Sequence, residues 1–307
     1  MTAKHEDNAI EPVPARGRGT KAKKKRGKRG IGWTITFWVA LAVFAGTAFF
    51  AGRILLSYWH GTAEYEDLAQ EVIEIPSDET ILTLADLTAD WDALLATNKD
   101  TVGWIYVPGT VINYPVVWCG NDYTYLTRSF TREGEHAVDF GAIFMEGENH
   151  PDLSDPHTIL FGHAMKNGTM FAAFYRMSWN NTFDKYRDIY YLTPNGNLHL
   201  KTFAYVWVPA TEMSALTCTF GSDAERTAFV QDKIRRSKFT TTEPIPNAQD
   251  ITTFFSFITC DSAAGNGRYI VYAYVVESTY PGIEGFGGID PNKPGGVSTD
   301  LVEGLGW

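Results

Sequence analysis

The sequence has few cysteines, with only Cys119, Cys218 and Cys260 among 307 residues. An odd number excludes complete pairing within one chain, so at least one thiol stays free or pairs between chains. A disulfide between Cys119 and Cys218 would leave Cys260 as the free thiol. Whether these two pair stays open, because a disulfide requires Cα atoms within about 7 Å of each other.

Basic residues are scarce beyond the N-terminal region. From residue 54 onward, 15 Lys and Arg residues face 33 Asp and Glu residues, a net charge of −18. So acidic a body argues against nucleic-acid binding. Residues 1–30 have the opposite character, with ten basic residues and three acidic ones. Their position beside an apolar run explains this basic cluster better than a nucleic-acid site does, so we expect no nucleic-acid partner.

Charge is absent altogether from Ile31 to Gly52, a run of 22 residues. As a helix this run reaches about 33 Å, enough to cross a bilayer core. The positive-inside rule then places residues 1–30 in the cytoplasm and the body outside the cell membrane. A cleaved signal peptide is the alternative, with small residues at 46–48, but the length of the run favours an uncleaved anchor. We predict a single-pass membrane protein that contacts lipid through residues 31–52.

Composition divides the chain into five expected segments, and no internal repeat is evident. They are a basic tail, a transmembrane helix, a juxtamembrane segment, one folded domain and a Gly/Pro-rich tail. Their expected bounds are residues 1–30, 31–52, 53–83, 84–280 and 281–307.

Short β-branched and aromatic runs separated by turn residues dominate the folded domain. Two long strands are predicted in "ITTFFSFITC" and "RYIVYAYVV", and "HTILF" predicts a short one. Pro194, Asn195 and Gly196 predict a hairpin. Many short strands with turn signals are typical of a barrel or sandwich. We therefore predict a mainly-β domain, a closed or nearly closed barrel with peripheral helices.

Helical patterns interrupt these strands at a few places. Residues 63–74, "GTMFAAFYRMSW" and "SDAERTAFVQDKIRRSKF" are predicted helices, the last with an N-cap at Ser222 or Asp223. Apolar residues at helical spacing predict another, with one buried face made of Leu84, Leu87, Trp91, Leu94 and Leu95.

Cys260 and Arg268 flank one loop between the two long predicted strands. If these strands are antiparallel neighbours, both residues lie at the mouth of the loop, on one rim. A thiolate is the nucleophilic form of cysteine, and a catalytic cysteine needs a cationic or basic neighbour. Arginine keeps its proton, so it suits an oxyanion or a substrate carbonyl better than proton transfer. The proton carrier must then be a histidine.

His163 is the favoured histidine because it directly follows a predicted strand and a glycine. Position alone nevertheless favours a loop histidine without a catalytic task. His136, His150 and His157 could instead form a metal site with His163. Their successive spacings of 14, 7 and 6 residues match no close-spaced pair of metal ligands, so we expect no metal.

Three stretches together resemble the sortase family, and within it most closely class B. They are "LLATNKDTVGWIYVPGTVINYPVV", "TILFGHAMKNGTMF" and "FSFITCDSAAGNGRYIVYA". The resemblance covers residues 84–277, with the His, Cys and Arg motifs in the family order. The predicted helix at 222–238 is similar to the additional helix of class B. The resemblance implies a closed eight-stranded β-barrel with peripheral helices, preceded here by one transmembrane helix.

The same resemblance implies a cysteine transpeptidase with no cofactor. Such an enzyme cleaves a C-terminal sorting signal after Thr, holds the Thr as a thioester and passes it to an amine. His163, Cys260 and Arg268 would be the catalytic set, and Thr259 would line the pocket for the substrate's Thr or the oxyanion site. Its partners would be secreted proteins bearing a sorting signal and an amine from a peptidoglycan precursor or a pilin lysine, in cell-wall anchoring or pilus assembly.

Other enzyme classes fit the order of these residues less well. A papain-like peptidase has its Cys before its His, whereas His163 precedes Cys260 by 97 residues. An L,D-transpeptidase carries a Ser-His-Gly-Cys run, which is absent from the sequence. A catalytically idle sortase-like adhesion module stays open, although no member of the catalytic set is missing. A metal-dependent envelope hydrolase also stays open, and the histidine spacings disfavour it.

Overall fold

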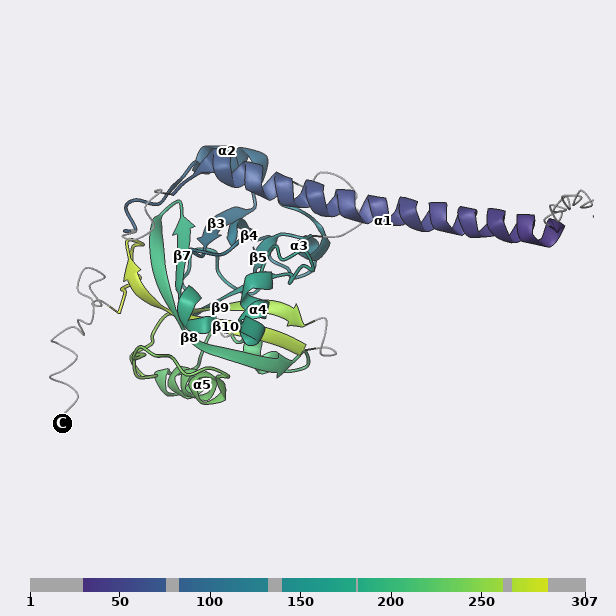
Figure 1. Cartoon of the computed structure of the whole chain (residues 1–307). Coiled ribbons are helices and arrows are strands. Elements are labelled where there is room, and N and C mark those ends of the chain that lie inside the picture. Colours follow the sequence, from purple (N-terminus) through teal and green to yellow (C-terminus); the bar gives the residue numbers. More distant parts are fainter. Residues whose placement is uncertain (1–29, 76–82, 132–139, 181, 262–266, 287–307) are drawn as a thin grey trace, which may run out of the picture. The chain divides into compact units, whose positions relative to one another are not determined.

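The computed structural model describes residues 30–75, 83–131, 140–180, 182–261 and 267–286 (Figure 1). The chain divides into two compact units, residues 1–50 and residues 51–307.

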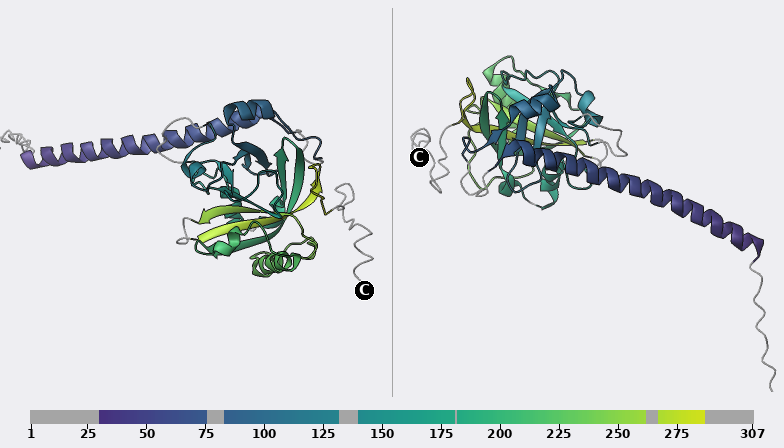
Figure 2. Two further views of the ribbon diagram at one scale, coloured as in Figure 1. Left: turned by 180° about the vertical axis from the view of Figure 1, so that it is seen from behind. Right: turned by 90° about the horizontal axis from the view of Figure 1, so that it is seen from above.

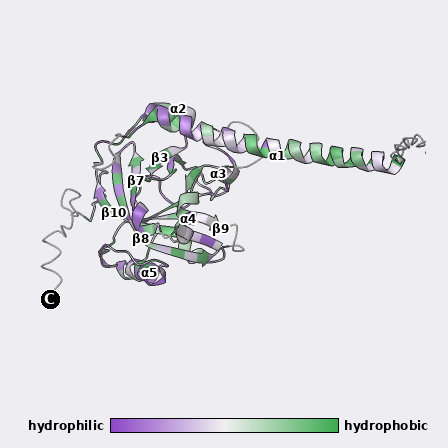
Figure 3. Ribbon diagram, viewed as in Figure 1, coloured by the Kyte–Doolittle hydropathy of each residue, from purple (hydrophilic) through white to green (hydrophobic). Residues whose placement is uncertain are grey.

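Helix α1 (Ile31–Val72) is one uninterrupted helix of 42 residues. Large apolar side chains are exposed along its first part, among them Trp33 and Phe44. Figure 3 colours much of this part as hydrophobic. By length and composition, it is the one helix among the described residues that could cross a membrane. Its second part has a different character, because Ser57, Gly61, Tyr65, Ala69 and Val72 are buried at intervals of three and four residues. This spacing puts them on one face, which packs on the barrel unit.

Eight strands of the described chain form a closed barrel, in the order β10-β8-β7-β3-β4-β5-β6-β9 (Figure 1). Their bounds are Thr101–Tyr106 for β3, Asn113–Val117 for β4, Ile143–Met145 for β5, His157–Gly162 for β6, Asp188–Thr193 for β7, Gly196–Pro209 for β8, Phe254–Asp261 for β9 and Gly267–Ser278 for β10. Neighbours are antiparallel except β4 with β5 and β6 with β9, which are parallel. The predicted closed eight-stranded barrel is confirmed.

Alternation along β9 and β10 explains why both strands are so rich in apolar residues. Phe255 and Phe257 belong to the large cluster that also takes in Val271, whereas Ile258 and Ile270 belong to a second cluster. The second cluster includes Val230 of helix α5 (Asp223–Arg236). Figure 1 and the left view of Figure 2, which is seen from behind, show α5 outside the barrel. These two strands are therefore buried on both faces.

Several local predictions match the structure. The hairpin between β7 and β8 turns at residues 194 and 195, with Thr193 opposite Gly196. Helix α4 (Ala172–Asn180) forms where the "GTMFAAFYRMSW" run predicted it. Helix α5 begins after Ser222, whose hydroxyl accepts a hydrogen bond from the Glu225 amide. The remaining short elements are α3 (Thr124–Thr127) and the 3₁₀ turns η2 (Phe183–Tyr186) and η3 (Met213–Leu216).

The helix predicted from Leu84 onward was wrong over its first half. Leu84 and Leu87 are buried, but Leu84 lies in a turn and Leu87 directly precedes strand β2 (Thr88–Ala89), which pairs with β1 (Ile73–Glu74). Helix α2 (Trp91–Thr97) begins only after Asp90, whose carboxylate caps it through the Ala93 amide. A capping Asp thus set the start of the helix, and the leucines before it are buried without being helical.

Candidate active site

The strand register brings the predicted catalytic residues to one end of the barrel. Strand β9 lies between β6, its parallel neighbour, and β10, its antiparallel neighbour. Gly162 is opposite Thr259, and Cys260 is opposite Arg268. Neighbouring strands are about 4.8 Å apart. His163, the residue after Gly162, therefore lies beside the backbone of Cys260, with Arg268 on the far side of it.

His163 is half-buried and held by a main-chain carbonyl. Its Nε2 lies 2.6 Å from the Leu126 oxygen in α3. A carbonyl oxygen only accepts, so Nε2 carries the proton and donates it to Leu126. In the neutral imidazole the lone pair is then on Nδ1.

The segment after His163 is a tight, internally bonded loop. The Phe171 amide donates to the His163 carbonyl at 2.8 Å, and Ala164 pairs with Met170 in an isolated β-bridge. On the strand side, a Cβ at Gly162 would come within 2.6 Å of the Phe171 ring. A larger residue at 162 would collide with that packing. The backbone that carries His163 is therefore fixed on both sides.

Arg268 offers a hydrogen-bond donor that the described protein leaves unused. Its side chain is half-buried, and Nη1 is buried without a hydrogen-bond partner in the described part of the chain. No carboxylate of the described side chains forms an ion pair with it; the side chain of Asp261 lies outside that description. A buried guanidinium N–H without a partner is costly, and an oxyanion or a substrate carbonyl would satisfy it.

Thr259 has its side chain on the other face of the sheet from Arg268. It is opposite Tyr269, one position along from the Cys260–Arg268 pair, and successive residues of a strand alternate between faces. Its hydroxyl is buried and has no partner among the described residues. A role of Thr259 in substrate binding stays a prediction.

The other two cysteines differ from a catalytic thiol. Both are free in the structure, so a Cys119–Cys218 disulfide is not formed. The Cys218 thiol donates to Glu146 Oε2 at 3.5 Å, and burial together with that carboxyl raises its pKa well above its usual range. Cys119 is half-buried, with its sulfur 3.4 Å from Asn121 Nδ2. The thiol of Cys260 and residues 262–266 lie outside the described part of the structure.

The remaining candidate histidines are engaged elsewhere. His157 is fully buried, with Nδ1 2.7 Å from the Thr217 carbonyl and Nε2 2.9 Å from Ser256 Oγ. His150 Nδ1 lies 3.0 Å from Asp155 Oδ1, and His136 lies outside the described residues. Across the described residues no group of three or more His, Cys, Asp or Glu side chains is arranged to hold a metal ion.

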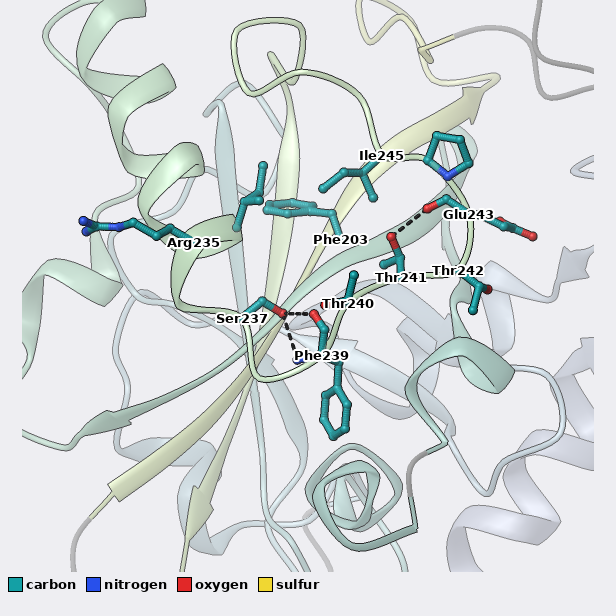
Figure 4. Close-up of a pocket in the computed structure, with 11 residues that line it drawn as sticks. Phe203, Arg235, Ser237, Phe239, Thr240, Thr241, Thr242, Glu243 and Ile245 are labelled. Atoms are coloured by element: carbon teal, nitrogen blue, oxygen red, sulfur yellow. Dashed lines mark hydrogen bonds between the residues drawn. The ribbon is translucent and has the colours of Figure 1, made fainter.

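One hollow of the barrel unit lies away from this site. It has a volume of about 560 Å³ and is lined by Phe203, Ile234, Arg235, Ser237, Phe239, Thr240, Thr241, Thr242, Glu243, Pro244 and Ile245 (Figure 4). Phe203 is five residues from Val208, the β8 partner of Arg268, which corresponds to about 16 Å along the strand. The hollow is therefore separate from the candidate catalytic residues.

Comparisons with known proteins relate the chain to one group of enzymes by sequence and by fold. No family model matches the chain. Sortase B of Staphylococcus aureus (strain NCTC 8325 / PS 47) is 26% identical over 217 residues, which are 70% of this chain and 84% of that protein. The crystal structure of sortase B from Bacillus anthracis in complex with AAEK1 aligns with a TM-score of 0.60 at 27% identity, over 72% of this chain and 99% of that one.

In sequence and in fold the chain is similar to sortases of class B. Both of these relatives are class B enzymes, which agrees with the resemblance in the sequence. A Staphylococcus aureus sortase B–substrate complex aligns at a TM-score of 0.58, over 72% of this chain and 98% of that one, and its 24% identity carries the fold alone. This similarity indicates a cysteine transpeptidase.

Sequence reasoning did not identify the Leu126 carbonyl as the partner of His163. The contact joins residues 37 positions apart through a main-chain atom. Every residue type has such an atom, so the sequence around Leu126 carries no signal for it.

Proposed function

We propose that His163, Cys260 and Arg268 are the catalytic residues of this sortase. The observation that supports this most directly is the register of three neighbouring strands, with Gly162 opposite Thr259 and Cys260 opposite Arg268. The unpartnered Nη1 of Arg268 and the tautomer of His163 add a donor and a proton acceptor beside the nucleophile. These are the three functions that thiol-based acyl transfer needs.

In the proposed reaction the Cys260 thiol transfers its proton to His163 Nδ1, and the sulfur attacks the carbonyl carbon of the substrate's Thr. Arg268 Nη1 donates to the negative oxygen that forms. Collapse of this intermediate breaks the peptide bond, and His163 returns the proton to the leaving amine. A second amine then attacks the thioester, loses its proton to the same imidazole and releases Cys260.

We further propose that the substrate is a C-terminal sorting signal on a secreted protein and that the acceptor is an amine of a peptidoglycan precursor or a pilin lysine. Helix α1 would anchor the enzyme, with residues 1–30 in the cytoplasm and the barrel outside. The exposed apolar side chains of its first part support this topology. Protease added to intact protoplasts should remove the barrel and spare the tail, and a mature chain beginning near residue 49 would contradict it.

The catalytic proposal is tested with the full chain in detergent micelles, a panel of sorting peptides and mass spectrometry of the trapped acyl-enzyme. Cys260→Ala should abolish the adduct, whereas Cys119→Ala should keep it. Arg268→Ala should slow turnover by about 10²–10³-fold, because one donor to the developing oxyanion is lost. Arg268→Lys should recover only part of that loss, because an ammonium lacks the planar fork.

The outcome also separates the alternatives. An adduct that survives Cys260→Ala, or turnover that Arg268→Lys restores fully, would contradict the proposed roles. If no peptide of the panel acylates the wild-type chain, the idle adhesion module becomes the better interpretation.

A further inference from the structure

The second part of α1 contacts residues that lie next to the segments around His163. Tyr65 is buried in the barrel unit, with 3% of its surface exposed. Its hydroxyl donates to the Gly141 carbonyl at 2.7 Å and accepts from the Phe130 amide at 3.1 Å. One turn earlier, a Cβ at Gly61 would lie 2.7 Å from the Phe140 ring, so helix and ring are in direct contact.

Gly141 in turn stands against the carbonyl that binds His163. Its φ of +61° and its surroundings exclude a side chain, because a Cβ would lie 2.6 Å from the Leu126 oxygen. The next residue, Ala142, donates its amide to the Tyr125 carbonyl at 3.0 Å. A shift of Gly141 therefore moves the Leu126 carbonyl, and the Tyr65 hydroxyl holds Gly141 in place.

A second arm runs from the Tyr65 ring to the loop after His163. The ring packs edge-on against Tyr114, with centroids 5.4 Å apart. The Tyr114 hydroxyl accepts from the Met170 amide at 3.0 Å, and Met170 is the bridge partner of Ala164, the residue after His163. Ring and hydroxyl of one tyrosine thus reach His163 by different routes.

Chemically, Tyr65 suits a fixed hydrogen-bonding role. Burial raises the pKa of its phenol well above its usual range, so the hydroxyl stays a neutral donor at any physiological pH. The two hydrogen bonds of the phenol and the packing of its ring together fix the orientation of the side chain.

We propose that Tyr65 is a positioning residue that fixes His163 in its Nε2-protonated tautomer through Gly141 and Leu126. The inference rests on the proposed role of His163 for its effect on turnover, but not for its effect on the tautomer. It makes the end of α1 next to the barrel a functional part of the active site. Loss of the hydroxyl releases Gly141, the Leu126 carbonyl moves, and the imidazole samples the other tautomer.

The test compares Tyr65→Phe with Tyr280→Phe in the full chain in micelles. Both substitutions remove one phenol bond to a backbone carbonyl, since Tyr280 donates to the Asp152 carbonyl at 2.8 Å. Tyr65→Phe should lower kcat by about 10-fold and leave KM within about twofold, because it misplaces a proton carrier and not a substrate contact. Tyr280→Phe should leave kcat unchanged. Rates are compared at a temperature where melting curves show both variants folded.

Histidine ¹⁵N spectra supply a readout that does not depend on turnover. The His163 signal, assigned by its loss in His163→Ala, should report the Nε2-protonated form in the wild type and a mixture of tautomers in Tyr65→Phe. Gly141→Ala, which displaces the Leu126 carbonyl directly, should give the same spectrum. An unchanged tautomer signal in both variants, or a kcat loss equal to that of Tyr280→Phe, would overturn the inference. If His163→Ala retained normal turnover, the proposed catalytic role would fail while the tautomer test still decided the role of Tyr65.

Discussion

His157 and His163 lie at the two ends of strand β6, and they differ in burial and in how many of their ring nitrogens are hydrogen-bonded. His157 is the first residue of the strand, fully buried, with both ring nitrogens bonded inside the protein. Burial lowers its pKa to about 3, so it is neutral. His163 follows the last residue of the strand, is half-buried and gives one nitrogen to the Leu126 carbonyl. Both ring nitrogens of His157 are satisfied, as in a structural histidine. Among the described residues only Nε2 of His163 has a partner, which agrees with the proposed role of His163 as a proton carrier.

The largest expected effect comes from removing the half-satisfied histidine. His163→Ala should lower turnover by about 10²–10⁴-fold, which is the usual contribution of a general acid or base. The melting temperature should change little, because the ring is half-buried and makes one side-chain hydrogen bond. Initial rates with the best sorting peptide, measured beside thermal melting, check this. A loss of rate that merely followed a loss of folding would remove the contrast with His157.

His157→Ala should do the reverse. The substitution leaves the buried Ser256 hydroxyl and the Thr217 carbonyl without their partner and opens a cavity beside Phe254, whose ring stacks on His157 at 4.4 Å. We expect a destabilisation of about 2–5 kcal/mol. Denaturant unfolding measures it, and the kcat of the remaining folded fraction should stay near the wild-type value. A fold-neutral His157→Ala would show that both histidines are dispensable to the barrel.

Lowering the pH should destabilise the folded protein through His157, by less than the His157→Ala substitution does. The folded pKa of His157, about 3, lies below its unfolded value of 6.5. The stability that its neutral ring contributes is therefore fully present above pH 6.5 and is lost as pH falls toward 3. The slope is about 1.4 kcal/mol per pH unit. His157→Asn should remove this slope, so its melting temperature should fall less than that of the wild type between pH 6.5 and 4.5.

A second buried group, Glu146, titrates in the same pH range, so the experiment needs a control. Burial raises the pKa of Glu146 to about 7. Its protonated form therefore stabilises the folded protein at low pH, and this contribution is lost as pH rises toward 7. Glu146 is present in both the wild type and His157→Asn, so its contribution cancels when their melting temperatures are compared. His150→Asn is the matched control: Asp155 raises the pKa of this exposed histidine, so the sign of its effect is opposite. Equal slopes for wild type and His157→Asn would contradict the buried neutral ring.

Features carried by local pattern were predictable, and features carried by contacts between distant main-chain atoms were not. The long apolar strands β9 and β10, the hairpin at residues 194–196 and the Ser222 cap could all be predicted from their own sequence. Leu84 and Leu87 misled because burial in a turn gives the same spacing as burial on a helix. The bond of His163 to Leu126 and the bond of Tyr65 to Gly141 left no pattern in the sequence, because both end on backbone carbonyls.

The parallel pairing of β6 with β9 has a consequence for the order of assembly. His157 is opposite Phe254, a separation of 97 residues, and this pair together with β9–β10 brings the ends of the sheet together. Contacts this distant in sequence form late, since the loop between them must first be closed. A chain synthesised from its N-terminus has α1 and most of the barrel strands before it has either Cys260 or Arg268. Cys260 comes to lie beside His163 only when the barrel closes, so partly folded chains carry this thiol without its neighbours in the proposed site.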